Sequence, residues 1–427
     1  MEEKKSRSII SILQSLCVLY ITIWTIAPPL QIDNIYRIAA LGAVGVWFLL
    51  NIPQKVTLER IHILAIIFAM LVMIVALMDS GGRFRKILGP INYYMMVITF
   101  IMGYCYKDRW HELSWMIPII LLLLVYFNFQ THKTVLDEPS VARTLVRNDA
   151  SAYHYLRRGV GGYGLLYPQV CILPIIVSWT ISAFRKHWIR FAIGVLWIIS
   201  FFLYLFNAGY SIAVAASIVS LIILFFYRRS SMVLAIIITT ALIVIIVWLI
   251  GYNAGFREWL ISIFDGTKVA TKINDLYLSI TTADTADSIM ARWEAYMDSI
   301  ISIISYPIIG GLWFPNGSGG GHSAILDTFA KYGLFGGVIF VRMLFHFSIT
   351  LKKSPQIKKD IFIANSIFIT VLMIALLNSM PFNYVCMIML IIPSAYDNII
   401  NWRHVNENSL DSKSDSERSL AKTKYTV

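Results

Sequence analysis

Apolar residues occur along this chain in blocks that are separated by shorter polar segments. A membrane-spanning helix needs roughly 17–25 predominantly apolar residues, and about 12 blocks approach that length. These blocks cover approximately residues 9–30, 35–52, 61–79, 88–106, 114–130, 165–184, 188–206, 208–227, 231–251, 333–351, 362–379 and 381–401. The pattern predicts an all-α polytopic membrane protein with about 12 transmembrane helices.

Basic residues alternate between the connections. Short clusters of Lys and Arg occur before the first block and then in every second connection. Among the short connections of the other side, one goes against the trend, with Arg83, Arg85 and Lys86. Cationic residues near span ends are retained in the cytoplasm. Both termini are therefore predicted to be cytoplasmic.

This topology places the two long connections, 131–164 and 252–332, together on the outer face. Long hydrophilic connections are uncommon unless they have a function. Residues 1–402 are predicted to form a single transmembrane domain. The tail, 403–427, is rich in Ser, Lys, Asp and Glu and is predicted to be a disordered cytoplasmic segment.

Composition agrees with a membrane protein. Of the 427 residues, 58% are hydrophobic and only 14% are charged. The net charge of +12 lies largely in the clusters at span ends, so it does not indicate a nucleic-acid-binding protein. The four cysteines lie in or beside apolar blocks and form no CxxC pair, which predicts neither a disulfide framework nor a zinc site.

The first outer connection is unexpectedly basic. It contains Arg147, Arg157 and Arg158, and a glycine-rich run from Gly159 to Gly164 follows. Arginine pairs bidentately with phosphate oxygens, so one interpretation is an anion site that faces the membrane surface. The alternative is attraction to lipid headgroups, with the glycines as a flexible entry to the next helix.

The second outer connection contains an amphipathic helix over 287–304. Ile289, Trp293, Tyr296, Ile300 and Ile304 share its apolar face. Arg292 falls at the edge of this stripe, either as part of an anion site or as an ordinary snorkelling side chain. His322 follows a glycine run and precedes the next span, where a histidine is able to act as a general base or to have a structural role.

The region around His322 resembles the bacterial O-antigen ligases and the Wzy-type O-antigen and capsule polymerases. Their shared pattern is His followed by Asn, Ser or Gln, nine variable residues, and Gly-x-x-Gly. The chain has His322-Ser323, nine residues to Tyr332, then Gly333-Leu-Phe-Gly336. Arg292-Trp293, Pro307-x-x-Gly310-Gly311 and, more loosely, Arg158-Gly159 through Tyr167-Pro168 are similar to upstream segments of that superfamily.

The resemblance implies a GT-C-like membrane glycosyltransferase that needs no cofactor and no metal. Its substrates are expected to be glycans on undecaprenyl pyrophosphate, at the outer face of the bacterial cytoplasmic (inner) membrane. A chain-length regulator protein is a further expected partner, and nucleic acid is not. His322 and Arg292 are expected to be catalytic, and Arg157, Arg158 and Arg147 to bind the substrate pyrophosphate.

The favoured function is polymerisation of lipid-linked repeat units into O-antigen, a part of lipopolysaccharide, or into capsule. One alternative is an O-antigen ligase that transfers finished glycan to lipid A–core, because the His motif does not separate the two. Another is a flippase or transporter for lipid-linked oligosaccharide. It is less favoured because Arg342 alone lies well inside a span and no internal repeat is evident.

Overall fold

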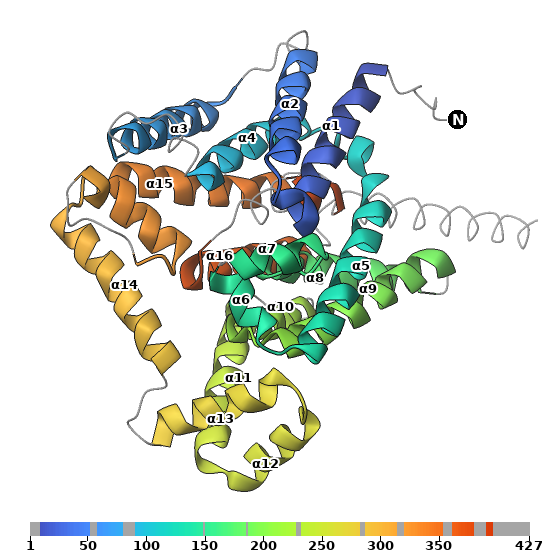
Figure 1. Cartoon of the computed structure of the whole chain (residues 1–427), viewed down its shortest axis with the longest axis vertical. Helices are drawn as coiled ribbons and strands as arrows, with labels where there is room; N and C mark the ends of the chain where they lie inside the picture. The colour runs from blue at the N-terminus through green and yellow to red at the C-terminus, as the bar shows by residue number, and fades with distance from the viewer. Residues whose placement is uncertain are drawn as a thin grey trace, which may run out of the picture.

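The computed structural model describes residues 9–51, 58–79, 90–147, 150–184, 187–227, 232–281, 287–313, 320–352, 361–379 and 390–395, and the regular elements within these ranges are helices (Figure 1). The first half contains α1 (Ile9–Ile26), η1 (Pro28–Gln31), α2 (Asn34–Asn51), α3 (Arg60–Asp79), α4 (Ile91–Cys105), η4 (Trp110–Leu113), α5 (Met116–Asp137), α6 (Val141–Arg147), α7 (Ala150–Arg157) and α8 (Tyr163–Ala183). The second half contains α9 (Trp188–Ala208), α10 (Ser211–Tyr227), α11 (Met232–Tyr252), α12 (Ala254–Ile263), α13 (Lys268–Thr281), α14 (Asp287–Ser305), η5 (Gly311–Trp313), α15 (Ala324–Lys352) and α16 (Ile361–Leu377).

Seven of the described helices are long and apolar enough to cross a membrane: α1, α2, α3, α5, α8, α9 and α15. An eighth candidate is the pair formed by α11 and α12, which is bent by 104°. Three other expected spans are the shorter apolar helices α4, α10 and α16, and most of the last, 381–401, lies outside the described residues. The chain thus has the architecture of a polytopic helical membrane protein, while the count of 12 and the GT-C-like arrangement stay predictions.

Helix α8 is the most buried of the candidate spans and is fixed by polar contacts inside the bundle. The side-chain amides of Asn128 on α5 and Gln169 on α8 exchange two hydrogen bonds, of 2.8 and 2.7 Å, and Asn128 also donates to Ser200 Oγ on α9 at 3.2 Å. Buried amides are costly unless they are satisfied. The network therefore favours one register of α5, α8 and α9, which positions the N-terminal end of α8.

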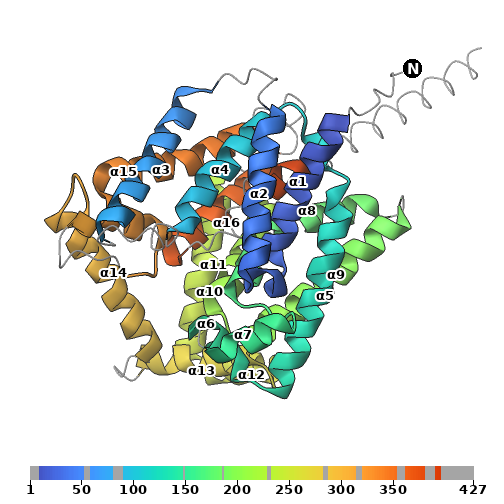
Figure 2. The ribbon, with the colours of Figure 1, turned by 45° about the horizontal axis from the view of Figure 1, so that its top comes forward.

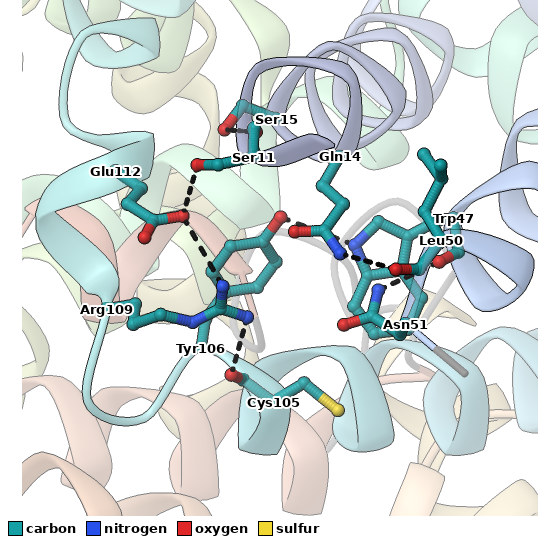
Figure 3. A network of polar contacts seen from close by, with 10 residues as sticks. All are labelled: Ser11, Gln14, Ser15, Trp47, Leu50, Asn51, Cys105, Tyr106, Arg109 and Glu112. Atoms are coloured by element: carbon teal, nitrogen blue, oxygen red, sulfur yellow. Dashed lines mark hydrogen bonds and ion pairs between the residues drawn. The ribbon is translucent and has the colours of Figure 1, made fainter. Parts of the chain in front are cut away.

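A second polar network joins the start of α1 to the ends of α2 and α4 (Figure 3). Ser11 Oγ donates to Glu112 Oε2 at 2.7 Å, and the same carboxylate oxygen lies 3.8 Å from Arg109 Nη1. Gln14 Nε2 donates to Leu50 O at 3.2 Å. These contacts bring together the beginning of α1, the end of α2 and the α4–α5 connection, while the cytoplasmic position of this end stays a prediction.

The short helices α6, α7, α12 and α13 gather at the end of the molecule away from the N-terminus (Figure 2). Helix α7 contacts η1, which lies between α1 and α2, and Arg157 Nη2 lies 3.7 Å from Asp33 Oδ1. Helix α7, in the first long connection, therefore lies at the η1 end of the α1–α2 pair, away from the Ser11–Glu112 network.

Candidate functional site

Helix α14 has one face that packs on the protein and one that points away from it. Ala295, Ser299 and Ser302 are buried, and they form the face that packs on the protein. Trp293 and Ile304, on the face that the sequence predicts to be apolar, are 60% and 74% exposed and point away from the protein, whereas Tyr296 of the same predicted face is partly buried. A stripe of this kind is typical of a helix that lies against lipid.

Arg292 lies beside the buried face of α14 and is itself partly buried. Its guanidinium hydrogen-bonds the hydroxyl of Tyr296, one turn along the helix. It also acts electrostatically on the hydroxyls of Tyr163 and Tyr167, at the start of α8. Arg292 thus links the second long connection to the end of the first.

The tyrosines at this junction form a continuous cluster. The Tyr163 ring is stacked on Tyr167, with centroids 5.5 Å apart, and tilted against Tyr210, with centroids 4.3 Å apart. The Tyr210 hydroxyl donates to Ala142 O at 3.3 Å. Tyr163 is only partly buried, so the cluster offers an aromatic surface next to a cation.

The end of α16 holds this junction together. Tyr296 Oη donates to Leu377 O at 2.8 Å, and the backbone N–H of Ala324, the first residue of α15, donates to Asn378 O at 2.9 Å. The Asn378 side chain hydrogen-bonds the Tyr167 hydroxyl. Three helices from distant parts of the sequence therefore meet at two consecutive residues.

Burial raises the pKa of Tyr296, while the charge of Arg292 and its hydrogen bond act in the opposite direction. Because burial has the larger effect, the Tyr296 hydroxyl stays protonated at neutral pH. It is therefore able to donate to Leu377 O and to accept from Arg292 at the same time.

The loop that carries His322 is anchored by a buried carboxylate. Asp327 is 4% exposed; its Oδ1 accepts from Ser299 Oγ at 2.7 Å and from Gly321 N at 3.2 Å, and its Oδ2 accepts from Ser323 N at 3.2 Å. Ser323 Oγ in turn accepts from Leu326 N at 3.1 Å, so Ser323 is the N-cap of α15. Asp327 therefore positions the loop, and its oxygens are already engaged.

The glycines of the two motif segments touch each other. Gly310 and Gly333 both have positive φ, of 83° and 66°. A Cβ on Gly310 would lie 2.2 Å from Lys331 O, and a Cβ on Gly333 would lie 2.2 Å from Ile308 O. Only glycine permits this backbone approach. It also interrupts the helical backbone of α15 at Gly333, the residue where the expected span begins, and a further helical segment precedes it from Ala324.

The turn of α14 that follows Arg292 is in direct contact with the loop that carries His322, residues 320–323. Gly320 N donates to Ser299 Oγ at 2.9 Å, and the α-carbon of Gly320 packs against the backbone of Ala295, one turn from Arg292. His322 is partly exposed, and its ring makes no hydrogen bond or ion pair with any described residue.

The glycine run of the first long connection is held by backbone hydrogen bonds and caps a helix. Gly159 has φ 83° and ends α7 in a Schellman motif, in which Gly159 N donates to Leu156 O and Val160 N donates to Tyr155 O. Gly161 N donates to Thr131 Oγ1 at 2.8 Å. The glycine run is thus a packed connection between helices.

The three arginines of the first long connection have different surroundings. Arg157 pairs with Asp33, and Arg158 is exposed near Tyr155. The backbone of Arg147 ends α6, two residues after Leu145, which packs on Gly162. Helix α6, which Arg147 ends, lies next to the tyrosine cluster, because the Ala142 carbonyl accepts from Tyr210 Oη.

Sequence reasoning missed the tyrosines and Asn378. Several of their contacts join residues that are far apart in the sequence, for example Tyr296 with Leu377, and the chain contains 22 tyrosines. The N-cap role of Ser323 had a readable signal, because Ser before an apolar helical segment is a helix-start pattern.

Within the described ranges, no three His, Cys, Asp or Glu side chains form a group that would hold a metal ion. No protein-family model matches the chain, and no curated protein matches it.

Proposed function

We propose that this chain is a membrane glycosyltransferase. In this proposal it polymerises undecaprenyl-pyrophosphate-linked oligosaccharide repeat units into O-antigen or capsular polysaccharide, at the outer face of the bacterial cytoplasmic membrane, within a GT-C-like bundle of about 12 spans. The observation that carries the proposal is the junction of the two long connections. There the charge of Arg292 acts on the hydroxyls of Tyr163 and Tyr167, and the loop that carries His322 packs on the turn of α14 that follows Arg292.

The position of Arg292 fits a diphosphate that arrives from the membrane. The exposed apolar stripe of α14, with Trp293 and Ile304, suits contact with lipid, and Arg292 is next to that stripe on the protein side. A polyprenyl chain in the bilayer would then bring its pyrophosphate to the depth of the guanidinium. The hydrogen bond to Tyr296 holds the guanidinium in place before the substrate binds.

The proposed reaction joins two lipid-linked glycans. A hydroxyl of the acceptor sugar attacks the anomeric carbon of the donor, and the bond between that carbon and the pyrophosphate oxygen breaks. His322 accepts the hydroxyl proton, and the undecaprenyl pyrophosphate leaves with the bonding electrons. Arg292 stabilises the negative charge that develops on the leaving group, which is commonly the largest catalytic contribution in such a site.

The aromatic cluster suits the sugar part of the substrate. Tyrosine offers an apolar ring face together with a polar hydroxyl, a combination that matches the CH and OH groups of a carbohydrate. Tyr163 is partly buried, its hydroxyl is within the electrostatic influence of Arg292, and its ring contacts Tyr210.

The test is elongation of a purified lipid-linked repeat unit by the protein in nanodiscs. We expect His322→Ala and Arg292→Ala each to abolish long-chain product, and Arg292→Lys to be strongly impaired because it loses the bidentate contact. The matched controls are His111→Ala, in η4, and Arg190→Ala, in the first turn of α9, and both should elongate normally. Normal chain length with His322→Ala and Arg292→Ala would overturn the assignment.

The cellular product separates this proposal from the alternatives. Loss of a polymerase leaves single repeat units on the carrier, whereas loss of a ligase leaves full-length glycan on undecaprenyl pyrophosphate. Movement of lipid-linked substrate across vesicles without elongation would favour a flippase.

A further inference from the structure

A cavity of about 350 Å³ lies between the two long connections, away from Arg292. Leu136 and Pro139 line it from the first connection, and Thr267, Lys268 and Thr271 line it from the second. The end of α9 completes the wall with Asn207. The cavity volume is in the range of small-molecule sites.

The close packing around the cavity shows that it is a defined site. Gly209, with φ 72°, ends α9, and its α-carbon packs on Lys268. A Cβ added at Gly209 would lie 3.3 Å from the Cβ of Lys268. Thr267 Oγ1 donates to Phe264 O at 2.7 Å, which closes the turn before α13. One wall is therefore fixed by the contact of a helix end with a helix start.

The lining mixes donors, acceptors and an apolar side. Asn207 is 9% exposed; its Nδ2 donates to Leu203 O at 2.8 Å, whereas its Oδ1 accepts from no described residue. The Lys268 ammonium and the first-turn N–H groups of α13 supply donors, and Thr271 supplies a hydroxyl. Leu136 and Pro139 supply apolar surface. A ligand with many hydroxyls and an apolar ring face fits this combination better than an anion, because Asp265 also lines the cavity.

The cavity adjoins the tyrosine cluster. Asn207 and Tyr210 are three residues apart, which is at most about 11 Å of chain. On the opposite wall, Pro139 is three residues before Ala142, whose carbonyl accepts from Tyr210 Oη. The same two backbone segments therefore line the cavity and hold Tyr210 against Tyr163.

We propose that this cavity is a second carbohydrate site, which binds a sugar residue of the glycan at a distance from the bond that forms. The identity of the ligand rests on the proposed function. Such a site retains the growing chain between successive additions, so it affects product length more than the first transfer.

The test is binding of a free repeat-unit oligosaccharide, released from its lipid carrier by mild acid, to the protein in nanodiscs. In Thr271→Trp an indole fills the cavity, and we expect affinity to be at least about tenfold weaker and polymer to be shorter. Thr281→Trp is the matched control, because Thr281 is also exposed on α13 but does not line the cavity. It should bind as the wild type does.

The outcomes separate this inference from the proposed function. Equal binding by the wild type and Thr271→Trp, or no saturable binding by the wild type up to about 10 mM, overturns the carbohydrate site even where the wild type elongates substrate. Binding that is lost only in Thr271→Trp supports the site. If no variant or wild type then elongates lipid-linked units, the polymerase proposal fails and the site remains.

Discussion

Replacement of Asp327 by asparagine tests whether the His322 loop must be held in one position. The carboxylate is buried and accepts hydrogen bonds from Ser299, Gly321 and Ser323. The amide has nearly the same shape but only one acceptor oxygen, so at least one buried N–H loses its partner. If the oxygen stays with Ser299 and Gly321, the amide NH2 group faces the N–H of Ser323.

The expected loss follows from that geometry. A hydrogen bond to a charged group contributes about 1.5–3 kcal/mol, and an unsatisfied buried donor costs a similar amount. We expect Asp327→Asn to lower the free energy of unfolding, or of loop opening, by about 2–3 kcal/mol. Since 1.4 kcal/mol is a factor of ten, turnover should fall by up to roughly 30- to 150-fold.

Thermal unfolding and elongation in nanodiscs would be measured side by side. Asp298→Asn is the control, because Asp298 is exposed on α14 and makes no contact with a described residue through its carboxylate. An Asp327→Asn protein that melts and elongates like this control would refute the role of Asp327 as the anchor of the loop.

Three further predictions concern the backbone and the tyrosine junction. Gly333→Ala should destabilise the protein by about 3 kcal/mol or more, because it combines positive φ with a backbone clash. The effect would be measured as loss of the monodisperse peak in size-exclusion chromatography. Gly42→Ala, where a Cβ would meet open space, should keep that peak. Gly159→Ala should lower stability by about 1–2 kcal/mol in thermal unfolding without a change in KM, because that glycine caps a helix. Tyr296→Phe should raise the KM for lipid-linked substrate by freeing Arg292. Burial raises the pKa of Tyr296. The protonated hydroxyl therefore contributes its full stabilisation below about pH 10, and this stabilisation is lost as the pH rises further. Above that pH, Tyr296→Phe should lose less stability than the wild type.

The sequence predicted the long apolar helices well and their ends less well. Helix α5 continues to Asp137, beyond the expected end at residue 130, and Thr131 on the added turn is buried and accepts from Gly161 N. Hydropathy ends a span where polar residues begin, but these polar residues have partners inside the fold. The same reasoning placed the start of the next span at residue 333, where Gly333 does divide α15 into two helical segments, but it missed the segment that begins at Ala324.

The candidate site was only partly predictable. The motif identified the region of Arg292 and His322, since both belong to local patterns. The pairing of Arg157 with Asp33 was not readable, because the two residues are far apart in the sequence and charge alone selects no partner. The tyrosine cluster was missed for the same reason.

Several residues of the His motif have structural roles, which distinguishes them from His322. Ser323 caps α15, and Gly310 and Gly333 permit a close backbone contact, so each of these residues is explained by the fold. Within the described part of the chain, His322 is not explained in this way, because its ring is partly exposed and makes no hydrogen bond or ion pair. A histidine in a loop that Asp327 anchors, whose ring makes no hydrogen bond or ion pair with a described residue, is the residue at this site whose role is best sought in a bound substrate.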